Sequence, residues 1–225
     1  MELPVSFADY TRTLLGDEDY KELVTSLESE QSVSIRLNPL KPFAFRSGEH
    51  AVPWCTSGFY LEERPTFTFD PLFHAGCYYV QEASSMFVEQ ALKQYMGEEP
   101  VVMLDLCAAP GGKTTLYASL AGSDGLVVAN EVNRQRAAVL ADNVRKWGLG
   151  NVAVTVNEPA QIAVLEGWFD IVAVDAPCSG EGMFRKESVA VTQYDQPLLD
   201  RCAALGAEIL ENAAAMLAPG GILVY

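Results

Sequence analysis

The sequence predicts an α/β protein built around an open parallel sheet, preceded by a smaller α+β N-terminal lobe. Short apolar runs rich in β-branched residues recur along its second half, helical patterns separate them, and a glycine turn joins the first run to its helix. The expected strands cover residues 101–104, 125–131, 152–156, 169–175 and 221–225. The expected helices cover residues 81–95, 114–120, 132–147 and 203–217.

The first third of the chain has a different character. Residues 1–30 have a helical pattern, and residues 34–41 read as a strand and turn that open a region rich in proline and aromatic side chains. That region runs to about Ala75. We therefore expect an accessory lobe over residues 1–75 and the main α/β domain over residues 76–225.

The composition indicates one sizeable core and a reducing environment. The chain has 225 residues, 49% of them hydrophobic, and no stretch is long or apolar enough to cross a membrane. Its five cysteines are an odd number, widely spaced and without a Cys-x-x-Cys pair. This pattern favours a cytoplasmic protein with no disulfide framework and no zinc site. The two histidines, His50 and His74, are too scattered to bind a metal.

The most informative stretch is the glycine turn between the first core strand and its helix. It brings backbone N–H groups to a helix N-terminus, where they are free to bind a ligand. Paired glycines let the ligand approach the backbone, and the lysine and the helix dipole favour a carboxylate or a phosphate. The residues predicted to bind a cofactor here are Cys107, Ala108, Ala109, Pro110, Gly111, Gly112 and Lys113.

A phosphate-binding P-loop is the remote alternative. Residues 112–114 match the end of that motif, and residues 171–175 resemble a strand that ends in a magnesium-binding aspartate. However, Cys107 stands where the motif has its first glycine, and Pro110 removes an N–H group from the loop. The pattern instead favours a nucleoside cofactor bound through its ribose and an amino-acid end.

Two further residues follow strands that end at the same edge of the predicted sheet. Glu131 lies about 20 residues after the glycine turn, where an acidic side chain accepts hydrogen bonds from ribose hydroxyls. The alternative role for Glu131 is a charge at the N-terminus of the next helix. Asn157 is predicted to hydrogen-bond an adenine amino group, and Arg136 is added to the cofactor-binding set.

A second motif follows the strand at residues 169–175. It delivers Asp175 and Cys178 into a glycine-containing loop at the carboxyl edge of the sheet, where ligands of open α/β sheets bind. A lone cysteine is more often a core residue than a nucleophile, but a loop position argues for reactivity. From the residues alone, Cys178 is the best candidate nucleophile.

These two motifs resemble the Nop/Sun family of RNA cytosine-5 methyltransferases. The resemblance rests on Asp-Leu-Cys-Ala-Ala-Pro-Gly-Gly-Lys at residues 105–113 and Asp-Ala-Pro-Cys-Ser-Gly-Glu-Gly at residues 175–182. Within that family the chain looks most like the bacterial RsmF (YebU) type, which modifies small-subunit (16S) rRNA. That closer likeness is carried by residues 52–60, 79–86 and 182–186.

The resemblance implies a Rossmann-like class I methyltransferase fold with S-adenosylmethionine as cofactor. It implies that Asp175 contacts the target base and the methionine end of the cofactor. The predicted catalytic residues are Cys178, Asp175 and Lys113. A cysteine thiolate adds to carbon 6 of cytosine so that carbon 5 can accept the methyl group. The family assigns this attack to a later Thr-Cys motif and gives Cys178 a part in product release. The N-terminal lobe is implied to help bind RNA.

The chain also departs from the family pattern. It stops at Tyr225, where a family member continues through Ser-Thr-Cys, and Asn157 replaces the usual aspartate. We therefore expect a fold truncated after its fifth core strand, with cofactor binding but little or no methyl transfer. A catalytically silent module that binds the cofactor and RNA is the second functional hypothesis.

Charge is at odds with RNA binding, because the net charge is −15 and phosphate contacts need cations. The basic residues are not spread evenly. Arg185 and Lys186 follow the Pro-Cys loop and are predicted to contact the RNA backbone, and Arg36 is added as an RNA contact. Arg36 forms an N-terminal cluster with Lys41 and Arg46. The predicted partner is ribosomal RNA in the small ribosomal subunit, with no membrane and no metal.

Overall fold

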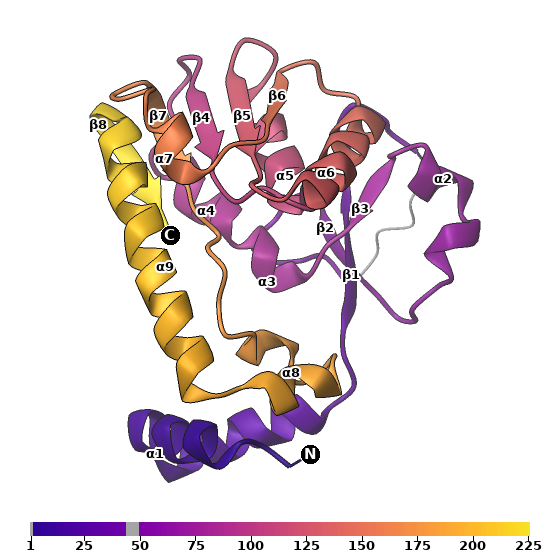
Figure 1. The fold of residues 1–225 in the computed structure, drawn as a ribbon. Helices are drawn as coiled ribbons and strands as arrows, with labels where there is room; N and C mark the ends of the chain where they lie inside the picture. Colours follow the sequence, from indigo (N-terminus) through magenta and orange to yellow (C-terminus); the bar gives the residue numbers. More distant parts are fainter. Residues whose placement is uncertain (1, 44–49) are drawn as a thin grey trace. The chain divides into compact units, whose positions relative to one another are not determined.

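The computed structural model describes residues 2–43 and 50–225 (Figure 1). The chain divides into two compact units. One, the split helical unit, consists of Met1–Gln31 and Pro177–Glu208; the other, the α/β unit, consists of Ser32–Ala176 and Ile209–Tyr225. The predicted boundary at residue 75 stays a prediction.

A parallel sheet of five strands forms the centre of the α/β unit, in the order β6-β5-β4-β7-β8. Every pair is parallel, as expected from apolar strands separated by helices. The strands are β4 (Val102–Asp105), β5 (Leu126–Asn130), β6 (Val152–Thr155), β7 (Phe169–Ala173) and β8 (Leu217–Val224). The five predicted core strands are therefore confirmed.

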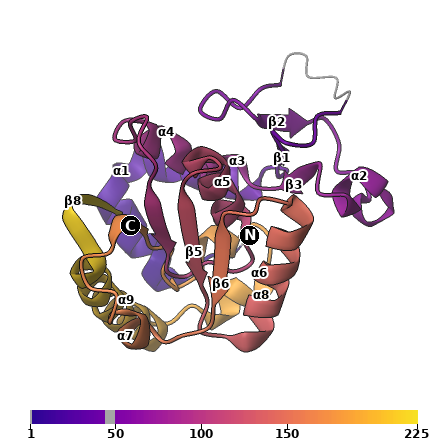
Figure 2. The ribbon, with the colours of Figure 1, turned by 90° about the horizontal axis from the view of Figure 1, so that it is seen from above.

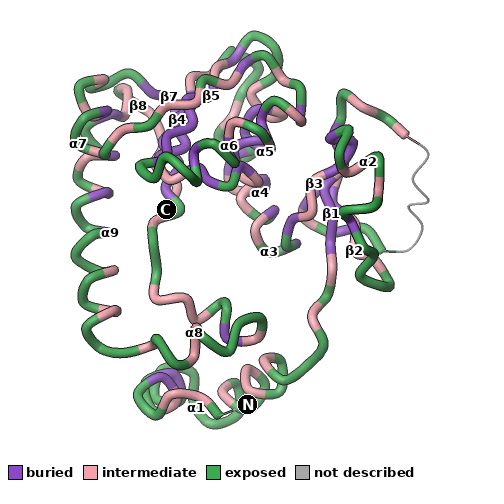
Figure 3. Tube along the Cα trace, turned by 45° about the vertical axis from the view of Figure 1, so that its right-hand side comes forward, coloured by how far each residue is buried: buried purple, intermediate pink, exposed green. Residues whose placement is uncertain are grey.

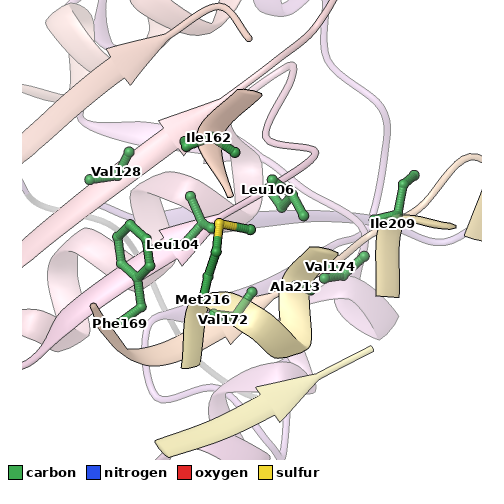
Figure 4. Close-up of a cluster of buried hydrophobic side chains, with 10 residues drawn as sticks. All are labelled: Leu104, Leu106, Val128, Ile162, Phe169, Val172, Val174, Ile209, Ala213 and Met216. Atoms are coloured by element: carbon green, nitrogen blue, oxygen red, sulfur yellow. The ribbon is translucent and has the colours of Figure 1, made fainter. Parts of the chain in front are cut away.

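Helices cover both faces of this sheet (Figure 2). One face packs against α4 (Val88–Lys93), α5 (Gly112–Ala121) and α6 (Arg134–Trp147). The other face packs against α7 (Pro159–Ile162) and the end of α9 (Gln196–Met216). Figure 4 shows the core on this second face, where side chains of β4, β5 and β7 meet those of the two helices. Figure 3 shows the same concentration of buried residues along these strands.

Two expected elements differ from the structure. The helix predicted over residues 81–95 is divided into α3 (Ala83–Met86) and α4, with Phe87 between them. The strand expected over residues 221–225 begins earlier, because β8 already starts at Leu217, and its pairing with β7 is irregular between Phe169 and Ile171. A side chain at Gly221 would place its Cβ 2.9 Å from the Asp170 carbonyl oxygen, so only glycine lets the strand pass here.

A second, antiparallel sheet lies in the same unit, in the order β2-β1-β3. Its strands are β1 (Val33–Leu37), β2 (Gly58–Leu61) and β3 (Tyr78–Val80), and the short helices η1 (Phe67–Phe69) and α2 (Pro71–His74) lie between β2 and β3. Its small core contains Ile35, Phe67 and Tyr78.

Polar contacts fix the small sheet to α6. The Asn38 amide donates to the carbonyl oxygens of Gly76 and Trp147, both at 2.8 Å. The Lys41 ammonium donates to the carbonyl oxygens of Ala75 and Lys146 at 2.8 and 2.6 Å, so it satisfies a carbonyl of the last helical turn. The two sheets are therefore parts of one compact unit.

The split helical unit contains α1 (Val5–Glu28), η2 (Glu181–Met183), α8 (Ser188–Gln193) and the first part of α9. Gly16, with φ +83°, kinks α1. The rings of Phe7, Phe184 and Tyr194 pack edge to face with centroids 5.1 to 5.8 Å apart, and Phe184 is buried. No helix in the described ranges is long and apolar enough to cross a membrane.

Gly76, which follows α2, lies against the backbone of α6, and we expect the stability of the protein to depend on this contact. This residue has φ +68°, and an added Cβ would lie 2.1 Å from the Lys146 carbonyl oxygen. We expect Gly76→Ala to destabilise the protein by about 2 kcal/mol or more, measured by urea denaturation. The matched control is Gly97→Ala, because nothing lies within 4 Å of its added Cβ. Equal midpoints for the two variants would contradict the assigned contact.

Candidate functional site

The site lies at the turn between β4 and α5. β4 ends at Asp105, and the chain turns through Gly111, with φ +108°, before α5 starts at Gly112. A Cβ at Gly111 would meet the Leu140 side chain at 3.1 Å, so glycine is needed for both its backbone angle and its space. The first N–H groups of α5 have no partner within the helix, which makes this end suited to an anionic or polar ligand.

Side chains from neighbouring elements hold the turn in place. The Asn143 amide donates to the Pro110 carbonyl oxygen at 2.8 Å, and the Tyr79 hydroxyl donates to the same atom at 3.3 Å. The Arg136 guanidinium donates to the Ala109 carbonyl oxygen at 2.9 Å. Three surrounding side chains therefore fix the loop before any ligand arrives, which lowers the entropy cost of binding.

Arg36 supports α5 from behind, and its predicted role in RNA binding is wrong. Its side chain is fully buried, so RNA cannot reach it. The guanidinium donates to Gln81 Oε1 (2.8 Å), the Gly112 carbonyl oxygen (3.0 Å) and Thr115 Oγ1 (2.6 Å), and it lies 4.6 Å from the Trp147 ring. Burial lowers the pKa of Arg36 to about 10, so it remains charged at neutral pH.

Three carboxylates lie at the carboxyl edge of the sheet. Asp105 is the last residue of β4, whereas Glu131 and Asp175 follow β5 and β7. Two of them are paired with cations. The Lys113 Nζ lies 2.8 Å from Asp175 Oδ2, and the Arg136 guanidinium lies 3.2 Å from Glu131 Oε2. The structure thus brings the predicted Lys113 and Asp175 together. Like charges otherwise accumulate here, and these cations offset them.

A cavity of about 190 Å³ opens at this edge. It is lined by most of the predicted loop residues together with residues from β3 and the segment after it. Those from the prediction are Cys107, Ala108, Ala109, Pro110, Gly112, Lys113 and Asp175. Gly111 caps α5 and Glu131 lies at the end of the adjacent strand.

Glu131 is buried, and its two oxygens have different partners. Oε1 accepts the Asn133 backbone N–H at 2.9 Å, so Glu131 does help form the start of α6. Oε2 accepts no hydrogen bond within the described residues, because the nearby Arg136 guanidinium is close but poorly aligned. A buried acceptor without a donor is costly, and a ligand hydroxyl would satisfy it.

Asp105 is the most perturbed acid of the site. Burial raises the pKa of Asp105 to about 7, against a partial opposing effect from the hydroxyl of Thr114, which donates to it at 2.7 Å, and from Lys113. The neighbouring Asp175 and Glu131 raise the pKa further. No role was predicted for Asp105 from the sequence, because a carboxylate at a strand end carries no sign of its burial.

Asn157 lies just after β6, and Asn130 fixes its backbone. Asn130 Oδ1 accepts the Asn157 N–H at 3.0 Å, and Asn130 Nδ2 donates to the Asn157 carbonyl oxygen at 2.9 Å. The hydrogen bonds described for Asn157 leave its side-chain amide without a partner in the part of the chain that the structure describes. The predicted contact with adenine stays a prediction.

The cysteines of the two motifs differ in environment. Burial and the nearby carboxylates raise the pKa of Cys107 to about 12, which keeps it a thiol and unsuited to nucleophilic attack. Cys178 is exposed and belongs to the split helical unit, as do Arg185 and Lys186. The roles predicted for these three residues stay predictions. Arg46 lies outside the described residues.

Tyr79, Gln81 and Asn143 are site residues that the sequence analysis did not assign to the site. Asn143 follows Arg136 by seven residues, which is two helical turns, so both lie on the same face of α6 and reach the same loop. Helical spacing could have found Asn143.

Within the described ranges, no group of three or more His, Cys, Asp or Glu residues is arranged to hold a metal ion.

Comparison with known proteins places the chain in a family. The model of the 16S rRNA methyltransferase RsmB/F matches residues 90–225, and that of the N-terminal domain of 16S rRNA methyltransferase RsmF matches residues 3–83. The chain belongs to the RsmB/F family. The predicted resemblance to the RsmF type is thereby confirmed.

Curated relatives of this RsmB/F protein carry the name ribosomal RNA small subunit methyltransferase F. The protein from Pectobacterium atrosepticum is 34% identical over 240 residues, which cover 99% of this chain and 49% of the relative. The protein from Vibrio vulnificus is 35% identical over 243 residues, covering 99% and 50% respectively. The chain spans about half the length of the curated relatives that it matches.

Solved structures show that the RsmB/F chain has the Rossmann-like fold of S-adenosylmethionine-dependent methyltransferases, as predicted. A methyltransferase homologue from Pyrococcus horikoshii is 30% identical with a TM-score of 0.75, covering 99% of this chain and 77% of that chain. NSun6 from the same organism, in a structure with SFG, has a TM-score of 0.79 at 17% identity and covers 98% and 82%. The second likeness shows the fold alone.

The buried Asp105 makes a prediction about pH. Its pKa of about 7 in the folded protein exceeds the ordinary value of 3.8, so the folded state holds the proton more tightly than the unfolded state. The stability that this proton contributes is complete below pH 4 and is lost as the pH rises through 7. Between pH 5 and pH 8 we expect a loss on the order of 2 kcal/mol in urea denaturation.

The matched variant is Asp105→Asn, which keeps the shape of the side chain and cannot ionise. It should remove this part of the pH dependence while other groups titrate as before. If the two proteins lose stability equally between the two pH values, Asp105 is not the group responsible.

Proposed function

We propose that this chain binds S-adenosylmethionine at the carboxyl edge of its sheet. We further propose that it contributes this site to methylation of carbon 5 of a cytosine in small-subunit rRNA. The observation that supports this most is the buried Glu131 Oε2 without a hydrogen-bond donor, next to a preformed glycine turn. The membership in the RsmB/F family supports the rRNA substrate and, with it, a cytoplasmic reaction.

The residues present fit such a cofactor. Glu131 would accept hydrogen bonds from the ribose hydroxyls, with Arg136 holding its carboxylate. The turn at residues 107–113 and the first N–H groups of α5 would receive the amino-acid end, and Asn157 would face the adenine amino group. A triphosphate fits less well, because three carboxylates gather at this edge against two cations.

The bound cofactor would supply an electrophilic methyl group on a sulfonium. The protein must position the base and move protons around it. The Asp175 carboxylate is largely exposed and is held by the Lys113 ammonium, so it can accept a hydrogen bond from the base without changing its own orientation. The thiolate that the resemblance assigns to a later Thr-Cys motif would add to carbon 6, and carbon 5 would take the methyl group. A base would then remove the carbon 5 proton so that the thiolate can leave. Cys178 is assigned to that release.

Replacement of Glu131 tests the ribose assignment. We expect Glu131→Ala to weaken S-adenosylmethionine binding about tenfold to a hundredfold in calorimetry, because two charge-assisted hydrogen bonds are lost. The control is Glu99→Ala, an exposed carboxylate that precedes β4 and so lies at the opposite end of this strand from Asp105. Equal affinity in the Glu131 variant and the unaltered chain would remove the assignment.

Methyl transfer tests the proposed activity. In a version of the chain extended past Tyr225 through the Thr-Cys motif, tritium from labelled S-adenosylmethionine should appear on carbon 5 of cytosine in small-subunit rRNA, and nuclease digestion locates it. The chain as given should transfer little or none. Asp175→Asn should lower the rate by about 100-fold or more while cofactor affinity changes only a few-fold. Label on another base or on the ribose would contradict the proposed reaction. If the extended protein binds S-adenosylmethionine but transfers no methyl group, only the proposed cofactor binding stands and the proposed methylation fails.

A further inference from the structure

A second hollow in the α/β unit lies beside the candidate site. It has a volume of about 570 Å³ and is formed by the segment from Arg64 to Thr68, by α2 and β3, and by one face of α6. Aromatic side chains dominate its wall: Phe67 and Tyr78 are buried, whereas Phe73 and Tyr79 are partly exposed. We call this site the aromatic hollow. The two partly exposed rings offer apolar area to a flat ligand.

Two cations flank these rings. The Lys146 Nζ lies 4.3 Å from the centroid of the Phe73 ring, and the Arg64 guanidinium lies 5.6 Å from that of Phe67. Neither cation forms an ion pair with any carboxylate of residues 2–43 and 50–225, and no residue that lines the hollow is acidic. In a chain with a net charge of −15, this local excess of positive charge is available to an anion.

We propose that the aromatic hollow binds an unpaired nucleotide of the RNA, with its base stacked on Phe73 or Tyr79 and its phosphate near Arg64 and Lys146. This inference rests on the proposed function, since it names a second contact on the same RNA. Stacking on aromatic rings combined with backbone cations is how proteins hold single-stranded nucleic acid. A protein partner would leave the two cations without carboxylate partners unless it were acidic at that point.

The aromatic hollow is connected to the cofactor turn by shared residues. Tyr79 and Val80 line both the aromatic hollow and the cavity at the turn. Asn143 also lines the hollow, and its amide donates to the Pro110 carbonyl oxygen and lies 3.3 Å from the Tyr79 hydroxyl. A nucleotide held in the hollow therefore lies next to the cofactor turn. We infer that it is an unpaired neighbour of the target base.

Fluorescence anisotropy with a short labelled RNA, single-stranded or annealed to its complement, tests this binding site. The double variant Arg64→Gln/Lys146→Gln should lose about fivefold or more in affinity for the single strand, and the slope of log affinity against log salt should fall by about 0.7, the value for one phosphate contact. Phe73→Leu should lose about fivefold or more with an unchanged salt slope. The control Lys21→Gln/Arg145→Gln removes the same charge from exposed positions outside the hollow and should change affinity less than about twofold.

Cofactor calorimetry on the same variants separates this inference from the proposed function. Unchanged S-adenosylmethionine affinity together with weakened RNA binding supports the hollow. If the unaltered chain binds RNA and the hollow variants behave like the control, the hollow is not a nucleotide site and the proposed function stands. A higher affinity for the duplex than for the single strand would also contradict nucleotide binding in the aromatic hollow. If the unaltered chain binds neither cofactor nor RNA, both proposals fail.

Discussion

The arrangement of the candidate site depends on the buried guanidinium of Arg36. It lies on β1 and donates to Gln81, which follows β3, and to two residues of the first turn of α5. A charge in such a position is stable only with close partners, since an unpaired buried charge costs several kcal/mol. The small sheet, α5 and α6 must therefore keep one relative geometry, and the Trp147 ring closes the remaining side. The same contacts fix the beginning of the helix that carries Lys113.

Electrostatic balance is the second constraint on this region. Asp105, Glu131 and Asp175 would repel one another if all were ionised and unpaired, and the two cations neutralise only the outer two. Asp105 accepts a hydrogen bond from the Thr114 hydroxyl instead of pairing with a cation. Burial raises the pKa of Asp105 to about 7, so part of the population is protonated at neutral pH. A ligand with a positive sulfonium and hydroxyl donors complements this edge, whereas a polyanion would add to the repulsion. The acidic character of the whole chain is therefore consistent with its cofactor site.

Much of this could be predicted from the sequence, because the responsible signals are local. Apolar runs located the five core strands, and the two glycines with Lys113 located the ligand-binding turn. Arg36 was assigned wrongly because its burial depends on residues 45 and 79 positions away, which no pattern near Arg36 reveals. The break at Phe87 and the irregular start of β8 follow from tertiary packing that overrides local propensity. The aromatic hollow was missed because its walls come from two distant segments, the stretch from Arg64 to Val80 and α6.

The packing of Phe7 against Phe184 and Tyr194 has a consequence for the order of folding during synthesis. The contact between Phe7 and Phe184 joins residues that are 177 positions apart in the sequence, and Tyr194 lies further still from Phe7. During synthesis α1 precedes the first four strands of the parallel sheet, and these strands precede the segment that covers Phe7. The loop that these contacts close is long, so they form late in folding. Phe7 therefore lacks both of its aromatic partners until the segment that contains Phe184 and Tyr194 has been synthesised.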